Sequence, residues 1–175
     1  MPRYMLGKNR GIMKQISISL ILAILLLSKI FSQDLSFRNY SGYYVSPGVN
    51  ISWDFSGAFI IGSKLSIGIL KNGSFYNVTF GILNSNDKAR YPYYYIECQY
   101  GVSSQYLESK GVILLNGIGA GIGIHTNGEE KIISYKVSLF SGNTIFINAS
   151  FLYDKKINPD IGFEAVLPFP VISLK

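Results

Sequence analysis

Apolar and polar residues alternate along most of the chain from residue 34 onward. The clearest case is the segment from Gly117 to Ile124, where isoleucine or alanine at every second position alternates with glycine. A period of two is typical of a β-strand with two unlike faces, and no convincing helical period appears after Asp34. The sequence therefore predicts an all-β fold for residues 34–175, with no internal repeat.

Eight segments with this alternation are separated by Gly, Asn, Ser and Pro, and we expect each to form a strand. They are residues 49–55, 59–70, 75–83, 93–102, 112–125, 132–140, 144–153 and 161–167. Two of the connections, Asn72-Gly73 and Asn127-Gly128, are strong hairpin signals because Asn and Gly tolerate a positive φ. Short connections of this kind predict an antiparallel order.

The composition of the two faces favours a single up-and-down β-barrel. The polar face consists mainly of Ser, Asn, Gly and Thr, with about one charge per strand, which suits a narrow lumen better than open water. The other face is almost entirely apolar, and aromatic residues lie near its strand ends, as in the girdles of membrane barrels. These aromatic residues are Trp53, Phe55, Tyr94, Tyr100 and Tyr153. A soluble sandwich or barrel with the same apolar face as its core remains the alternative.

Five charged residues fall on the polar face by strand parity. In a narrow barrel they converge on the axis, where a single charge is costly and needs a partner. We therefore predict an ion-pair network in the lumen. Its members are Asp54, Lys64, Glu97, Lys136 and Glu164.

The glycines of the fifth predicted strand leave a groove on the same face. Tyr93 and Tyr95, on the neighbouring strand, are expected to fill it, since aromatic rings often cover strand glycines. The glycine run is not a nucleotide-binding loop, because no helix follows it.

The first 33 residues have the features of a secretory signal peptide. Lys14 precedes the apolar run 16–27, and we place the cleavage site at Ser32–Gln33, with Met13 as a possible true start. The run is shorter than the roughly 20 residues that a membrane helix needs, although an uncleaved anchor remains the alternative. Residues 34–175 form the mature domain.

The excess positive charge belongs to this leader. It holds five of the 16 Lys and Arg residues and no acid, which leaves 16 − 5 = 11 basic against ten acidic residues in the mature domain. A nucleic-acid surface needs clustered basic residues on the folded domain, so the sequence predicts no nucleic-acid partner.

The sequence offers no persuasive catalytic, cofactor or metal site. His125 is the only histidine, and its place at a strand end beside a turn predicts a solvated rim residue. Glu97 and Glu164 are expected to lie on opposite sides of the ring, in structural ion pairs rather than as an acid and a base. Cys98, the only cysteine, is expected to face apolar surroundings.

A leader, about 140 mature residues and eight alternating segments rich in Gly and aromatic residues resemble the small outer-membrane β-barrels of Gram-negative bacteria. The Phe31-Ser32-Gln33 end of the leader is similar to exported proteins of the Bacteroidetes group. The resemblance implies a non-enzymatic barrel in the outer membrane, with its lipid as partner and a structural, surface-interaction or small-solute role. The alternative is a periplasmic or secreted β-domain that binds an apolar ligand or a protein.

Prolines near both ends of the domain depart from that family's pattern. Proline cannot donate a ladder hydrogen bond, so Pro168 and Pro170 are expected at or beyond the end of the last strand, and Pro47 is expected to limit the first. Closure of the barrel would then depend on few residues.

Overall fold

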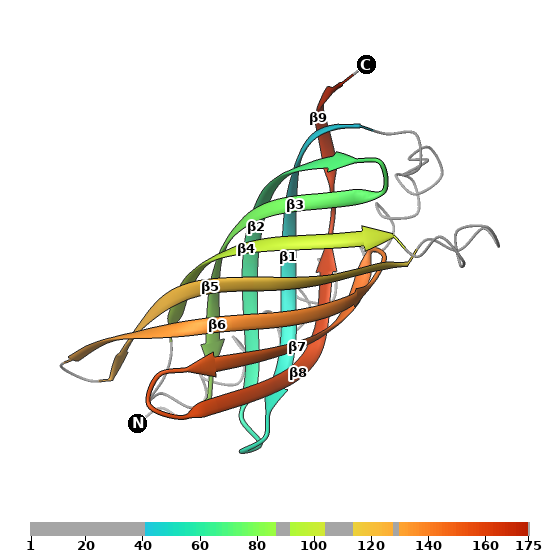
Figure 1. Cartoon of the computed structure of the whole chain (residues 1–175). Helices are drawn as coiled ribbons and strands as arrows, with labels where there is room; N and C mark the ends of the chain where they lie inside the picture. Colours follow the sequence, from blue (N-terminus) through green and yellow to red (C-terminus); the bar gives the residue numbers. More distant parts are fainter. Residues whose placement is uncertain (1–40, 87–91, 104–113, 128–129, 175) are drawn as a thin grey trace, which may run out of the picture. The chain divides into compact units, whose positions relative to one another are not determined.

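The computed structural model describes residues 41–86, 92–103, 114–127 and 130–174 (Figure 1). The described residues all belong to one compact unit. The predicted leader, the first residues of the predicted strand 112–125 and Gly128 of the second Asn-Gly turn lie outside the described residues.

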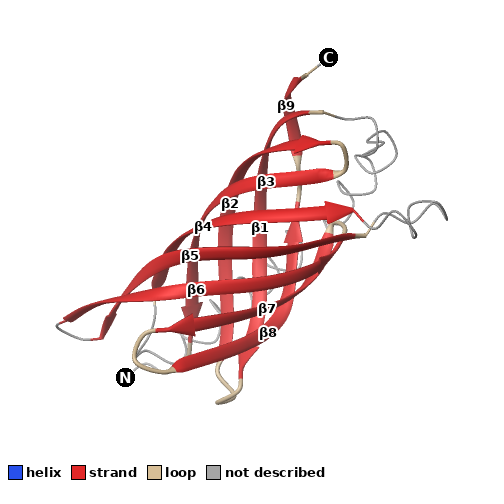
Figure 2. Ribbon diagram, viewed as in Figure 1, coloured by secondary structure: helices blue, strands red, loops and turns tan. Residues whose placement is uncertain are grey.

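The described residues form β-structure throughout, as the alternation predicts (Figure 2). No helix among them is long and apolar enough to span a bilayer. The strands are β1 (Gly42–Asp54), β2 (Phe59–Lys71), β3 (Ser74–Ser85), β4 (Tyr93–Ser103), β5 (Leu115–Asn127), β6 (Glu130–Gly142), β7 (Ile145–Tyr153), β8 (Ile157–Val166) and β9 (Phe169–Ser173).

The first eight strands close into an antiparallel, up-and-down barrel. Each pairs with the next along the chain, and β8 returns to pair with β1. The connection between β2 and β3 is the tight turn that the sequence predicts, with φ of 52° at Asn72 and 75° at Gly73. The predicted fold class is confirmed.

The barrel closes despite the prolines. Pro168 lies beyond the end of β8 as expected, but the expectation that Pro47 limits the first strand was wrong. β1 begins at Gly42 and runs through Pro47, whose carbonyl accepts a hydrogen bond from the Leu167 N–H at 3.0 Å. Because the N–H and C=O of one strand residue point to the same side, the missing donor of Pro47 faces this junction and leaves the pairing with β2 intact.

A ninth strand, which the sequence analysis missed, extends the closing edge. β8 pairs with the second half of β1, from Gly48 to Asp54, and β9 pairs with its first part, where Tyr44 lies opposite Pro170. The regular ladder with β1 therefore ends at Val166, Leu167 keeps one hydrogen bond to Pro47, and the ladder resumes at Phe169, so that closure involves nearly the whole of β1.

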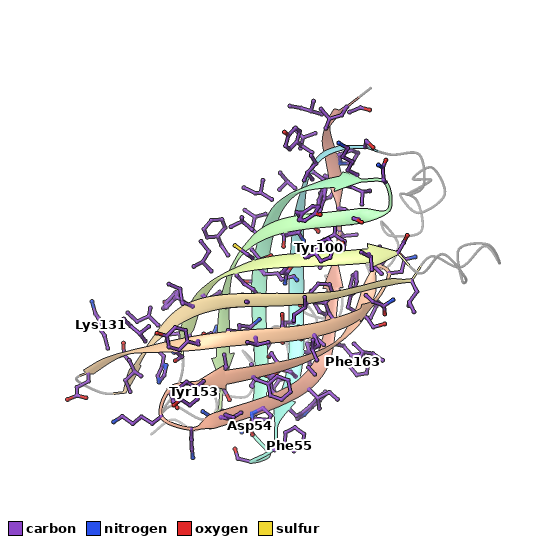
Figure 3. All side chains as sticks on the ribbon, viewed as in Figure 1. Asp54, Phe55, Tyr100, Lys131, Tyr153 and Phe163 are labelled. Carbon is purple, nitrogen blue, oxygen red and sulfur yellow. The ribbon has the colours of Figure 1, made fainter. Side chains whose placement is uncertain are left out.

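The burial of side chains is the inverse of that in a soluble barrel with an apolar core (Figure 3). Outward-facing residues are apolar and exposed, such as Ile122 at 51% and Phe163 at 53% of their surface. Inward-facing residues include completely buried polar groups, such as Thr79 and Ser138. The predicted assignment of the two faces is thus the observed one.

Aromatic side chains lie on the outer face near both ends of the strands. Tyr76 and Tyr100, whose ring centres are 4.8 Å apart, lie toward the end where β1 starts, and Trp53 and Phe59, 5.6 Å apart, lie toward the other end. All five aromatic residues predicted for the girdles are exposed. Among the described residues, no outward-facing Asp, Glu, Lys or Arg lies between the two aromatic zones.

Candidate functional site

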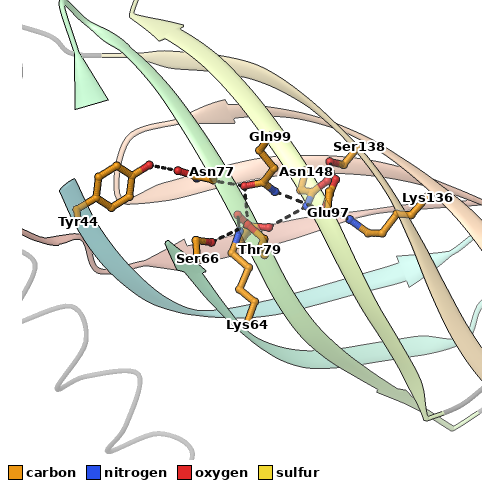
Figure 4. Close-up of polar contacts among 11 residues, drawn as sticks. Tyr44, Lys64, Ser66, Asn77, Thr79, Glu97, Gln99, Lys136, Ser138 and Asn148 are labelled. Carbon is orange, nitrogen blue, oxygen red and sulfur yellow. Dashed lines mark hydrogen bonds and ion pairs between the residues drawn. The ribbon is translucent and has the colours of Figure 1, made fainter. Parts of the chain in front are cut away.

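A network of buried polar side chains fills the middle of the lumen (Figure 4). The side chains come from β1, β2, β3, β4, β6, β7 and β8, and they meet because the pleat directs every second residue inward. Four of the five residues predicted for the lumen network belong to it, in two separate ion pairs.

The first ion pair joins β6 to β4. Lys136 Nζ lies 2.6 Å from Glu97 Oε2, and Glu97 also accepts hydrogen bonds from Ser138 and from Gln99 Nε2 at 3.4 Å. The Lys136 ammonium lies 4.7 Å from the centre of the Tyr95 ring, which adds a cation–π contact. Both charged groups therefore have several protein partners.

The second ion pair joins β2 to β8. Lys64 Nζ contacts Glu164 Oε1, and Asn148 Nδ2 donates to the other carboxylate oxygen at 3.0 Å. A Cβ at Gly48 would lie only 3.2 Å from Lys64 Cε, so glycine at this position makes room for the lysine side chain to cross β1.

Neutral side chains extend the Glu97 pair along the inner wall. The Gln99 Oε1 atom accepts hydrogen bonds from Thr79 at 3.1 Å and from Asn77 at 3.3 Å. Tyr44 donates its hydroxyl hydrogen to Asn77, and Ser66 bonds to Thr79 at 2.8 Å. These hydrogen bonds join β1 to β3, β2 to β3 and β3 to β4, so the network connects four strands.

Asp54 does not take the place that strand parity predicts for it. It lies half-buried at the turn between β1 and β2, where its carboxylate accepts hydrogen bonds from the Ser56 and Ala58 N–H groups at 2.9 and 2.7 Å. These two hydrogen bonds to backbone N–H groups of the turn hold the carboxylate at the end of the barrel.

Asp160 is a buried carboxylate that the sequence analysis missed. It accepts a hydrogen bond from Ser150 at 2.5 Å and lies opposite Asp54 in the β1–β8 pairing. Asp160 is an even number of positions from Glu164, so the alternation would have placed it on the inner face as well. It was missed because the predicted strand begins at Ile161, whereas β8 begins at Ile157.

The glycines of β5 accommodate two kinds of side chain. A Cβ at Gly123 would collide with the Tyr93 ring, as expected, but Tyr95 covers Gly81 of β3 rather than a glycine of β5. Gly119 and Gly121 instead leave space for Glu97, which a Cβ at either position would meet. The glycine run therefore makes room for a charged group as well as for aromatic rings.

Apolar side chains close the lumen at both ends of the polar layer. One cluster lies at the end where β1 starts and consists of Tyr44, Leu70, Phe75, Leu115, Phe140 and Phe146. The other lies at the opposite end and consists of Ile60, Leu83, Tyr93, Tyr95 and Leu152. Because Glu97, Thr79 and Ser138 keep at most 1% of their surface accessible, the polar layer between these clusters is closed to bulk solvent.

His125 is buried inside the barrel, so its predicted position on a solvated rim was wrong. Its Nδ1 atom lies 3.3 Å from Ser134 Oγ, and its ring packs near that of Tyr93. The last residues of β5 still belong to the closed ring, and their parity turns this side chain inward. Among the described side chains, no group of three or more His, Cys, Asp or Glu residues is arranged to hold a metal ion.

Cys98 lies on the apolar outer face, between Val78 and Ala120 of the neighbouring strands. Its surroundings on the sheet are apolar, as expected, but its side chain is exposed on the isolated barrel.

These features define a closed eight-stranded β-barrel with an apolar exterior and a filled polar lumen. No family model and no curated protein matches the chain. The solved structures similar to it include one described as "De novo design of transmembrane beta-barrels", at 14% identity (TM-score 0.41, covering 71% of this chain and 95% of that one). They also include Neisserial surface protein A, at 14% identity (TM-score 0.44, covering 75% of this chain and 99% of that one). Neither of these structures supports the predicted similarity to the Bacteroidetes group.

Proposed function

We propose that this chain is a non-enzymatic β-barrel protein of a bacterial outer membrane. One observation carries the proposal: the charged groups of the barrel wall are buried inside, and the exposed outer face between the aromatic zones is apolar. In water this arrangement would expose a continuous apolar belt, which soluble monomers avoid. In a bilayer the apolar outer face contacts lipid, while the charged groups stay inside the polar lumen.

The dimensions of the belt support this proposal. Tyr43 and Trp53 face outward ten residues apart on β1. That separation corresponds to about 33 Å of strand, or roughly 25 Å of depth at a tilt of about 40°, which is the height of the apolar band in outer-membrane barrels. The exposed lysines Lys71, Lys131, Lys155 and Lys156 lie at strand ends or turns, outside this band.

Within this class we propose a structural role without conduction. The two apolar clusters and the network between them leave no open path for a solute through the described barrel, which favours a membrane anchor over a channel. The same packing argues against a soluble barrel with an apolar ligand inside, because polar and charged groups occupy the space that such a ligand would need. His125 lies inside the lumen and has no access to a lipid, which argues against a lipid-modifying enzyme.

Cell fractionation and bilayer recording test this proposal together. The protein should require detergent for extraction from the outer-membrane fraction, and the folded form should migrate differently on a gel before and after boiling. Purified barrels in a planar bilayer should show no steady conductance. A protein that stays monodisperse in plain buffer contradicts the membrane location, and a reproducible open channel contradicts only the structural role.

A further inference from the structure

The two ion pairs of the lumen differ in how completely the protein satisfies them. Glu97 accepts hydrogen bonds from Ser138 and Gln99 besides its contact with Lys136, and the Lys136 ammonium also faces the Tyr95 ring. Lys64 makes one polar contact among the described residues, with Glu164, whose other carboxylate oxygen accepts from Asn148. An ammonium group has three hydrogens to donate, so two of those on Lys64 have no acceptor in the part of the chain that the structure describes.

Three buried acceptors near this pair also lack a partner among the described residues. They are Ser46 Oγ, Asn50 Oδ1 and Asn148 Oδ1. The three residues keep only 3%, 8% and 3% of their surface accessible, so bulk water does not satisfy them. Buried polar atoms in folded proteins are almost always hydrogen-bonded, either to protein or to ordered water.

The strand pairing places all three acceptors around the same ion pair. Lys64 lies opposite Gly48, and Ser46 and Asn50 are the next inward-facing residues of β1 on either side of it. Asn50 lies opposite Glu164, and the Nδ2 group of Asn148 donates a hydrogen bond to that carboxylate. The unused donors and the unused acceptors therefore lie within the same layer of the lumen.

The inward side chains of β1 beside the pair are short and mostly polar. From Ser46 to Ser52 its inward residues are Ser, Gly, Asn and Ser, all of them small. A buried water molecule typically needs two to four polar partners, and this wall offers them on both sides of the Lys64 ammonium.

We propose that the lumen binds ordered water between Lys64 and the acceptors Asn50, Asn148 and Ser46. Each water molecule accepts a hydrogen from the ammonium group and donates to the oxygen atoms. A metal cation would satisfy the same oxygen atoms, but the charge of Lys64 opposes it. The hydrated pair is the one at Glu164, beside the three unsatisfied acceptors, whereas the Lys136 ammonium at Glu97 has the Tyr95 ring as its second contact.

Nuclear magnetic resonance of the full mature barrel in deuterated micelles tests the proposal. Magnetisation transfer from water to the side-chain amide hydrogens of Asn50 and Asn148 should have the sign of long-lived, bound water. Gln99 is the internal control, because its buried amide is bonded directly to Glu97, Thr79 and Asn77. Absence of transfer at both asparagines, or transfer with the sign of rapidly exchanging water, would overturn the proposal.

A variant shows whether the residues share the water. Asn50→Leu removes an acceptor that has no direct protein partner, so it should reduce the transfer at Asn148 at least twofold. Gln99→Leu, at a buried position in the other network, should leave the transfer at Asn148 unchanged. An unchanged signal at Asn148 in folded Asn50→Leu would overturn the shared site, and if that variant does not fold, the measurement on the unmodified barrel still decides.

Discussion

The Nζ atom of Lys136 lies 2.6 Å from Glu97 Oε2, and the two side chains keep only 5% and 1% of their surface accessible. They come from β6 and β4, which are separated by β5, and the glycines of β5 allow the carboxylate to reach its partners. An ion pair so deeply buried is a structural constraint: either charge alone would be unpaired in a medium of low polarity.

Replacing one partner of this pair should destabilise the barrel strongly. Lys136→Met leaves the Glu97 carboxylate without its cation, and we expect a loss of about 3–5 kcal/mol in the free energy of unfolding. Adding Glu97→Gln should restore part of that loss, because the two groups are in contact. Urea unfolding of the single and double mutants measures both effects.

Lys131→Met is the matched control, since this lysine is exposed at the start of β6 and should change stability by less than about 0.5 kcal/mol. If Lys136→Met and Glu97→Gln each cost under about 1 kcal/mol and add independently, the pair does not have the proposed structural role.

Ser138→Ala should be clearly destabilising. Strand parity alone predicts a nearly silent change, because a small residue on the polar face is replaced by another small residue. The structure instead shows Ser138 fully buried and donating to Glu97, and a hydrogen bond to a charged group contributes roughly 1.5–3 kcal/mol. Ser63→Ala, on the outer face of β2, should be close to neutral in the same unfolding series, and equal effects at the two positions would contradict the expectation.

A charge on the outer face should have an effect that depends on depth. Ile122→Arg, in the middle of the apolar band, should cost roughly 2–4 kcal/mol in a lipid-embedded barrel. Thr126→Arg lies on the same face of β5 but near its end, and should cost at most about 1 kcal/mol. Reversible unfolding from lipid vesicles measures both, and identical costs at the two depths would argue against a bilayer around the barrel.

The turn between β2 and β3 should tolerate one substitution and resist the other. Gly73 has a φ of 75°, and a Cβ there would lie 2.7 Å from Ser103 Oγ, so Gly73→Ala should destabilise by roughly 1–2 kcal/mol. Asn72→Gly at the neighbouring positive φ should be nearly neutral. Thermal unfolding of both variants in micelles checks the expectation, which fails if Gly73→Ala is the better tolerated change.

The leader is expected to be removed at or within three residues of the Ser32–Gln33 bond. The apolar run 16–27 after Lys14 and the small residue at position 32 predict cleavage by signal peptidase. N-terminal sequencing of protein purified from its membrane fraction measures the position. An intact leader, or a mature N-terminus before residue 28, contradicts this prediction.

The sequence by itself determined the all-β class, the order of the eight barrel strands and the orientation of their faces, but not the ninth strand. These follow from local rules: a period of two separates the faces, and Asn72-Gly73 fixes a hairpin. The same parity placed Lys64, Glu97, Lys136 and Glu164 inside the barrel.

Only the tertiary structure decided which of these groups meet. Lys64 and Glu164 are 100 positions apart in the chain, and their contact across β1 depends on ring closure and on the space left by Gly48. Closure also decided the role of the prolines, since Pro47 meets Leu167 only when β8 returns to β1. Parity assigns a side chain to a face, whereas its partners depend on the stagger of eight strands around the axis, which no local pattern in the sequence encodes.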